Sequence, residues 1–280
     1  MTTLKARQKL GKYRLVRRIA SGPYADVFEA SDTIEGVRVA LKVPHATMVT
    51  PSMLEDFRRE VRITARLDHP NVQTIKNADF IGERFVVAQS LGTESLADRL
   101  KRRLGLERAY DYAGQLLEAV AHAHEHRIIH CDIKPENVLL FPGDQLRLTD
   151  FGISKVALRT LSASGSGTVG YVAPEQALGQ PRFESDVFSA AIVVYRMISG
   201  ARPEWPFQWP LAGSARLRRN APRGVVEFLR KCLEVDYRKR HRDGISMFEA
   251  WEELAPGIER YLRLRRARRR RAGAAREATT

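Results

Sequence analysis

The chain has 280 residues, of which 44% are hydrophobic and 29% charged, a composition that is typical of a folded globular protein and excludes a disordered chain. Two cysteines are too few for a disulfide scaffold, and no apolar run reaches the ~18 residues of a membrane-spanning helix. The net charge is +14, and half of this excess lies in residues 256–280, which contain nine arginines and two glutamates. We therefore expect a cytoplasmic protein without a signal peptide, in which a mildly basic body precedes a strongly basic tail.

The first ninety residues have the pattern of a β-rich unit. Alternating apolar residues over 13–43, interrupted by turn residues, predict three antiparallel strands. Residues 52–67 carry apolar side chains at helical spacing, and Asp68-His69-Pro70-Asn71 ends that helix. Two further strands are predicted at 72–80 and 84–89.

After Gly92 the pattern changes to helices. Apolar periodicity predicts helices at 95–103, 109–126, 185–199, 222–233 and 245–254. Short strand patterns occur within 128–151, and 152–172 is a loop rich in Gly, Ser and Thr. A β-rich part followed by a helical part predicts an α+β protein.

Two segments of the β-rich part have residue types suited to binding phosphate. The first, Ile19-Ala20-Ser21-Gly22-Pro23-Tyr24-Ala25-Asp26-Val27, joins two strands, and its backbone N–H groups can cover phosphates where little side chain intervenes. The second is Val39-Ala40-Leu41-Lys42, followed by Glu60 on the predicted helix. A glutamate facing this lysine would offset its burial and hold the ammonium toward a phosphate. Taken alone, the first segment fits an ordinary hairpin with a Gly-Pro turn better, and the second fits a strand lysine that reaches solvent better.

Two segments of the helical part have catalytic residue types. In His130-Cys131-Asp132-Ile133-Lys134-Pro135-Glu136-Asn137, an aspartate can accept a hydroxyl proton, a lysine can neutralise phosphate charge and an asparagine can bind a metal through its amide oxygen. Asp150-Phe151-Gly152 follows a strand pattern and offers a carboxylate for a Mg²⁺ that bridges phosphate oxygens. A polar turn and an ordinary loop aspartate are the simpler alternatives, but the two segments lie close together in the chain.

In this order and at this spacing, the four segments resemble those of the eukaryotic-like Ser/Thr protein kinase family, of the soluble bacterial type, over residues 13–255. Gly167-Thr168-Val169-Gly170-Tyr171-Val172-Ala173-Pro174-Glu175 resembles the end of a kinase activation segment. Ser185-Asp186-Val187-Phe188-Ser189 resembles the start of the buried helix whose aspartate braces the catalytic loop. Arg240 matches the arginine that pairs with the glutamate of Ala-Pro-Glu, which is Glu175 here.

The resemblance implies a two-lobed protein kinase fold of the α+β class, with a nucleotide cleft between the lobes. The small β-rich lobe would cover about 13–91 and the larger helical lobe about 92–255. An N-terminal extension, 1–12, and the Arg-rich tail, 256–280, would lie outside the kinase domain.

The resemblance also implies catalytic roles, with ATP and Mg²⁺ as cofactors and a Ser or Thr hydroxyl of a protein as acceptor. Lys42 would bind the α/β-phosphates and pair with Glu60, and Asp132 would orient the hydroxyl and accept its proton. Lys134 would stabilise the transferred phosphoryl group and marks the Ser/Thr branch of the family. The metal ligands would be Asn137 and Asp150, and Thr168 would lie beside Asp132.

The nucleotide pocket is implied in the same way. Adenine would lie between Val27, Ala40 and Leu139, and backbone groups of Gln89 and Leu91 would bond its edge. Ala88 would guard the space behind adenine. The phosphate loop would consist of Ile19, Ala20, Ser21 and Gly22.

Departures from the family pattern leave an alternative open. Ala20 and Ala25 replace two glycines of the phosphate loop, Cys131 replaces the arginine before the catalytic aspartate, and Gln89 replaces a hinge glutamate. The altered loop favours a pseudokinase, a module that binds nucleotide and signals by conformation. Retention of every charged catalytic residue favours an active kinase.

Two further features have more than one interpretation. The basic tail is a solvated charge run or a surface for nucleic acid or anionic lipid, with Ile258, Tyr261, Leu262 and Leu264 as a weak apolar stripe. His122, His124, Glu125 and His126 form a metal cluster or simply the end of a helix.

Overall fold

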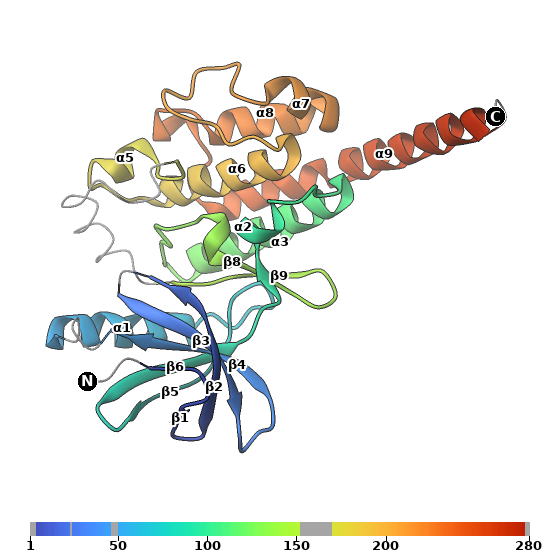
Figure 1. Cartoon of the computed structure of the whole chain (residues 1–280). Helices are drawn as coiled ribbons and strands as arrows, with labels where there is room; N and C mark the ends of the chain where they lie inside the picture. The colour runs from blue at the N-terminus through green and yellow to red at the C-terminus, as the bar shows by residue number, and fades with distance from the viewer. Residues whose placement is uncertain (1–3, 23, 46–49, 152–169, 278–280) are drawn as a thin grey trace.

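The computed structural model describes residues 4–22, 24–45, 50–151 and 170–277, and these residues form two lobes (Figure 1). The smaller, N-terminal lobe is a six-stranded antiparallel sheet in the order β1-β2-β3-β4-β6-β5, with helix α1 packed against it. Its elements are β1 (Lys9–Leu10), β2 (Tyr13–Ser21), β3 (Ala25–Asp32), β4 (Arg38–Pro44), α1 (Pro51–Thr64), β5 (Ile75–Ile81) and β6 (Arg84–Ser90).

Local sequence explains where α1 begins and which side it buries. Thr50 caps the helix by accepting a hydrogen bond from the backbone N–H of Met53 at 3.2 Å, and Pro51 occupies a first-turn position where no donor is needed. Phe57 packs against Phe85 of β6, with ring centroids 6.4 Å apart. Glu60 lies almost one turn further along the same face, so the packing carries its carboxylate into the protein.

The larger lobe is built around α3 and α6, whose facing sides form the main hydrophobic core. Helix α6 is buried along nearly its whole length because most of its residues are apolar or small on every side. A three-stranded sheet, β7-β8-β9, lies at the junction with the N-terminal lobe (Figure 1). The elements of this lobe are β7 (Glu94–Ser95), α2 (Leu96–Arg99), α3 (Leu106–Glu125), η2 (Pro135–Asn137), β8 (Val138–Phe141), β9 (Gln145–Leu148), α5 (Pro174–Ala177), α6 (Phe183–Ser199), α7 (Ser214–Asn220), α8 (Arg223–Cys232), η3 (Tyr237–Lys239) and α9 (Gly244–Glu277).

The expected two-lobed α+β architecture is confirmed, and one helix is much shorter than predicted. In place of a helix over 95–103, Ser95 ends β7 and caps the four-residue α2 by accepting from the N–H of Asp98 at 3.1 Å. The chain then carries three consecutive basic residues, 101–103, which offer no apolar side chain to bury along a further turn. Within the described ranges, no helix combines the length and the apolar composition needed to cross a membrane.

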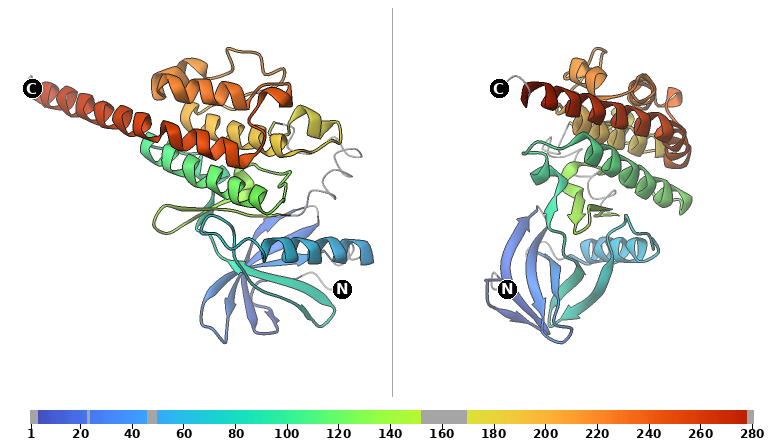
Figure 2. Two further views of the ribbon diagram at one scale, coloured as in Figure 1. Left: turned by 180° about the vertical axis from the view of Figure 1, so that it is seen from behind. Right: turned by 90° about the vertical axis from the view of Figure 1, so that its right-hand side faces the viewer.

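The last helix extends much further than its sequence pattern predicts. The periodicity predicts a helix over 245–254, whereas α9 continues through Pro256 and the basic segment and projects beyond the lobe (Figures 1 and 2). Ile258 is buried in the main core, and the hydroxyl of Tyr261 donates to a backbone carbonyl at the end of α7 at 2.6 Å. These contacts stabilise the helix beyond the proline, which removes one backbone donor. The domain boundary expected at 255 therefore lies inside a helix.

A buried ion pair between Glu175 and Arg240 joins α5 to the segment after η3, as the resemblance implied. The guanidinium donates to both carboxylate oxygens, at 2.8 and 3.1 Å, and to the backbone carbonyl of Glu184 at 2.9 Å. The hydroxyl of Ser185 donates to the same carboxylate at 2.6 Å. Both charges therefore have hydrogen-bond partners that offset the cost of their burial.

We expect Arg240→Met to lower the free energy of unfolding by about 3–5 kcal/mol, because it leaves the Glu175 carboxylate buried without its cation. The double variant Arg240→Met/Glu175→Gln should lose less than the single variant, since the buried charge is then absent. Urea unfolding at neutral pH measures both values. Equal losses in the two variants would contradict this explanation.

Candidate active site

Lys42 joins the two lobes through two carboxylates. Its Nζ lies 2.7 Å from Oε1 of Glu60 on α1 and 2.8 Å from Oδ1 of Asp150, which follows β9. The strand register places Lys42 between Val27 of β3 and Val87 of β6, so it lies inside the sheet and its side chain is only 9% exposed. The alternative of a strand lysine that reaches solvent is therefore wrong.

The pKa shifts of this trio follow from burial and from the sharing of one ammonium by two carboxylates. Burial by itself would lower the pKa of Lys42, but Asp150 and Glu60 outweigh burial and hold the pKa above its ordinary value. Burial raises the pKa of Glu60 although Lys42 opposes the shift. Burial also favours a higher pKa at Asp150, but the nearby Lys42 ammonium outweighs burial there, and the pKa of Asp150 is lowered. The ammonium and the Asp150 carboxylate therefore remain charged at neutral pH.

The segment between α3 and β8 brings Asp132, Lys134 and Asn137 together. Nζ of Lys134 lies 2.8 Å from Oδ2 of Asp132. The side-chain amide of Asn137 donates to the same Oδ2 at 2.8 Å and to the backbone carbonyl of Asp132 at 2.9 Å. Because the amide nitrogen faces Asp132, the amide oxygen of Asn137 is the atom that remains for a cation. Asp132 and Lys134 are 25% and 21% exposed, so a substrate can reach them.

Asp186, in the first turn of α6, braces this catalytic segment from inside the lobe. Its carboxylate accepts the backbone N–H of His130 at 2.6 Å and that of Cys131 at 2.8 Å. Cys131 has a φ of 64°, a left-handed conformation that costs energy for a residue with a side chain. Two hydrogen bonds offset this cost. The N–H of Cys131 donates to Asp186, and the side-chain amide of Gln176 donates to the carbonyl of Cys131 at 2.5 Å.

His124 is a functional residue that the sequence reasoning missed. Its Nδ1 accepts the backbone N–H of Gly244 at 2.7 Å, so Nε2 carries the proton and donates to Asp186 at 3.0 Å. The ring is buried and ties α3 and the start of α9 to the brace of the catalytic segment. The sequence placed His124 in a possible metal cluster, and only the fold separates it from its neighbours His122 and His126.

The residues expected around adenine come from both lobes. Ala40 of β4 lies opposite Gln89 of β6 in the strand register, and both are buried. Val27 of β3, Leu91 after β6 and Leu139 of β8 are half-buried. Their role as an adenine pocket stays a prediction, and their positions at the junction of the lobes are compatible with it.

The expected phosphate loop covers the end of β2, with Ile19, Ala20 and Ser21, and the start of the turn to β3 at Gly22, and all four residues are exposed. The hydroxyl of Ser21 donates to Asp26 at 2.7 Å, and the N–H of Gly22 donates to the carbonyl of Ala25 at 2.9 Å. A Cβ at Gly22 would lie 3.4 Å from that carbonyl, an ordinary contact, so this turn does not require a glycine. The two alanine replacements also leave the strand pairing intact, since Ala20 lies opposite Val27 and Ala25 opposite Pro44. Gly152 and Thr168 lie outside the described residues.

The charges and donor atoms of the cleft fit a magnesium ion. The site brings the carboxyl groups of Glu60, Asp132 and Asp150 together with the two ammonium groups of Lys42 and Lys134. A carboxylate oxygen and an amide oxygen, from Asp150 and Asn137, are the hard oxygen donors that Mg²⁺ prefers. The ion pair with Lys42 holds Asp150 in place, and hydrogen bonds to Asp132 hold Asn137.

A lysine held by two carboxylates, facing an aspartate–lysine–asparagine group across a two-lobed fold, defines the protein kinase class. Residues 13–248 match the family model described as Protein kinase domain, and the chain belongs to this family. It is 40% identical over 206 residues to serine/threonine-protein kinase PknA of Mycobacterium tuberculosis, covering 69% of this chain and 48% of that protein. It is 32% identical over 268 residues to serine/threonine-protein kinase pkn2 of Myxococcus xanthus, covering 86% of this chain and 32% of that protein.

The chain therefore spans less than half the length of these two relatives. Its fold is similar to the crystal structure of the Mycobacterium tuberculosis PknI kinase domain, with a TM-score of 0.68 at 24% identity. That match covers 90% of this chain and 99% of the other.

Ala88 provides a test of the expected nucleotide pocket. It is 1% exposed on β6, opposite Leu41 of β4, in the run that leads to Gln89. We expect Ala88→Met to weaken inhibitors that carry a large group behind adenine by tenfold or more, about 1.4 kcal/mol, because the longer side chain fills their space. The matched variant Ala88→Ser should retain their affinity. Equal affinities for all three proteins, measured by competition binding, would show that the hinge lies elsewhere.

Proposed function

We propose that this chain is an active Ser/Thr protein kinase that transfers the γ-phosphoryl group of ATP to protein hydroxyls. One observation carries the proposal: Asp132 lies within 2.8 Å of both Lys134 and Asn137, and Lys42 is held at 2.8 Å from Asp150. These are the charged groups that phosphoryl transfer needs for positioning and for stabilising the transition state. A pseudokinase would not require the whole set.

Each residue has a defined part in the proposed reaction. Lys42, oriented by Glu60, binds the α- and β-phosphates of ATP. Asp132 orients the acceptor hydroxyl, whose oxygen attacks the γ-phosphorus while the bond to the β,γ-bridging oxygen breaks and ADP leaves. The hydroxyl proton passes to Asp132, and Lys134 compensates the charge of the transferred group. Asn137 and Asp150 would hold Mg²⁺, which supplies positive charge to the phosphate oxygens when bound.

We expect Asp132→Asn and Asp150→Ala each to lower the rate of transfer from labelled ATP to a basic protein substrate by at least ~10²-fold. The control is Glu136→Gln, which removes an exposed carboxylate from the same segment and should retain most of the activity. Nucleotide binding without transfer in the unaltered protein would support the pseudokinase alternative. A near-normal rate in either aspartate variant would overturn the proposed roles.

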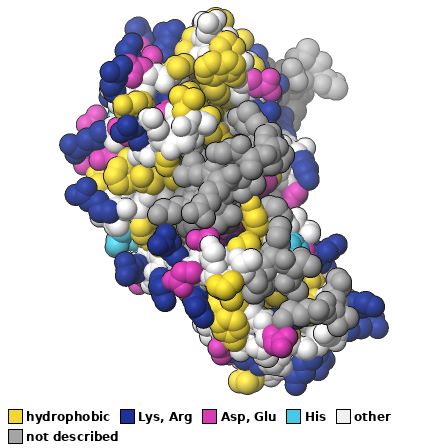
Figure 3. Space-filling model, turned by 90° about the vertical axis from the view of Figure 1, so that its left-hand side faces the viewer, with side chains coloured by type: hydrophobic (Ala, Val, Ile, Leu, Met, Phe, Trp, Pro, Cys, Tyr) yellow, Lys and Arg dark blue, Asp and Glu magenta, His cyan; other side chains and the backbone are white. Residues whose placement is uncertain are grey.

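A second proposed function concerns a basic groove on the larger lobe. The groove has a volume of about 1240 Å³ and is formed by the connection between α2 and α3, the end of α6, α7 and the middle of α9. Ten Lys or Arg side chains and three acidic ones line it. Arg103, Arg216 and Arg219 make no ion pair with any described residue. Elsewhere, on the face drawn in Figure 3, basic side chains are spread over both lobes among acidic ones.

We propose that this groove and the continuing helix bind the phosphate backbone of nucleic acid. Nine of the ten cations are arginines, which bond phosphate oxygens in pairs. After Leu264, the chain contains no large apolar residue, so the basic end of the helix has no apolar face to insert into a lipid surface. Sequence-independent contacts to phosphates fit this arrangement better than a membrane does.

We expect two separate variants, Arg103→Glu and a truncation after Arg266, to bind a labelled nucleic-acid duplex more weakly. Their affinity should also depend less steeply on salt concentration, because fewer phosphates are contacted. The truncation retains Tyr261 and Arg265, which hold α9 to α7. Arg14→Glu, an exposed arginine of β2, is the matched control and should bind as the unaltered protein does. Binding to anionic vesicles but not to the duplex would contradict the choice of nucleic acid, and unchanged binding in both variants would place the site elsewhere.

A further inference from the structure

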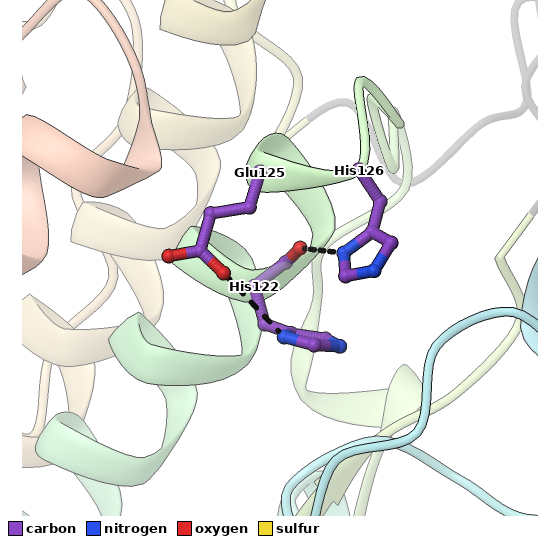
Figure 4. A group of neighbouring side chains, drawn as sticks. All are labelled: His122, Glu125 and His126. Atoms are coloured by element: carbon purple, nitrogen blue, oxygen red, sulfur yellow. Dashed lines mark hydrogen bonds and ion pairs between the residues drawn. The ribbon is translucent and has the colours of Figure 1, made fainter.

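The last turn of α3 and the residue that follows it carry three metal-ligating side chains that the kinase site does not use. His122, Glu125 and His126 each offer a ligand atom, and these atoms lie within 4.8 Å of one another (Figure 4). Spacings of three and four residues place the three side chains on one side of the helix. Among the described residues, this is the only group of three His, Cys, Asp or Glu side chains whose ligand atoms lie this close together.

We propose that His122, Glu125 and His126 bind one zinc-type divalent cation, with water completing its coordination. Two imidazoles and one carboxylate are a ligand set that Zn²⁺ accepts with an open position. Imidazole ligands also favour Zn²⁺, Cu²⁺ and Ni²⁺ over Mg²⁺, so the site differs from the oxygen-donor site in the cleft.

The spacing of the donor atoms supports this proposal. Nδ1 of His122 and Oε2 of Glu125 are 3.6 Å apart, which is longer than a hydrogen bond. Two ligands at ~2.0–2.1 Å from one tetrahedral ion are separated by ~3.3–3.5 Å. The ring centroids of His122 and His126 are 4.4 Å apart. Nδ1 of His126 donates to the backbone carbonyl of His122 at 2.9 Å, which leaves Nε2 of this exposed ring as its ligand atom (Figure 4).

The His122 ring has no other evident role for its nitrogen atoms. Nε2 is buried without a hydrogen-bond partner among the described residues, and Nδ1 lies 3.6 Å from Oε2 of Glu125. By contrast, both nitrogens of the neighbouring His124 have partners in the core.

The position of the group connects it to the N-terminal lobe. The ring of His69, in the connection from α1 to β5, stacks on that of His122 with centroids 4.7 Å apart. His69 is held by its own contacts, since its Nδ1 accepts the N–H of Asn71 at 3.1 Å. A cation bound at the end of α3 would therefore fix the ring against which this connection packs, so binding should also stabilise the folded protein.

The test is titration of the full chain, without an affinity tag, with Zn²⁺ by calorimetry and by thermal unfolding, with Mg²⁺ in parallel. We expect one Zn²⁺ per chain, a rise in melting temperature with Zn²⁺ but not with Mg²⁺, and at least tenfold weaker binding in His122→Ala and in His126→Ala. Glu125→Gln should also weaken Zn²⁺ binding. Because this side chain is exposed, the substitution should leave the fold intact, so the loss would come from the missing carboxylate.

Matched controls separate this site from adventitious binding. His45→Ala removes a histidine from the N-terminal lobe, and Asp111→Asn removes an exposed carboxylate from the first half of α3. Both should bind Zn²⁺ as the unaltered protein does. Equal affinity in the His122 and His126 variants and the unaltered protein, or no saturable binding of one Zn²⁺, would overturn the proposal.

Discussion

The buried carboxylate of Asp186 is the constraint on which the active site depends. A charge with almost no solvent exposure is costly unless hydrogen bonds surround it. The donors lie 55 to 62 residues before Asp186 in the chain: the backbone of His130 and Cys131 and the ring of His124. Satisfying one carboxylate therefore fixes the path of the segment that contains Asp132 and holds Cys131 in its left-handed conformation.

The same reasoning extends to the other side of the cleft. Lys42 is buried in the centre of a sheet, where its charge is tolerated because Glu60 and Asp150 lie within hydrogen-bond distance. Glu60 belongs to α1 and Asp150 to the end of the small sheet, so the pairing fixes the two lobes relative to each other. Phe151, which is fully buried, packs edge-on against His130 with centroids 4.6 Å apart and joins this group to the catalytic segment. The charged groups are thus oriented before a substrate arrives, which is the main requirement of electrostatic catalysis.

Helix α9 connects the core of the larger lobe to its basic surface. Met247 and Trp251, near its start, are buried against the main core, whereas Arg265 and Arg266 line the groove. The guanidinium of Arg265 bonds the side chain of Asn220 at 3.1 Å, and Arg266 pairs with Glu107 at the start of α3. The first part of the basic tail is therefore a fixed surface of the folded lobe rather than a separate solvated segment.

From the sequence alone, residue patterns predicted most helices and strands. The resemblance to the kinase family predicted the two-lobed architecture and the roles of Asp132, Lys134, Asn137 and Asp150 with their partners Lys42 and Glu60. Both kinds of prediction rest on residue types at fixed spacings along the chain. Only the tertiary structure decided the role of His124, the continuation of α9 through Pro256, the early end of α2 and the meeting of His122 with His69. Each of these depends on a distant side chain or backbone group that completes a hydrogen bond or covers an apolar surface. A local sequence pattern does not predict which distant group that is, because folding brings the two together.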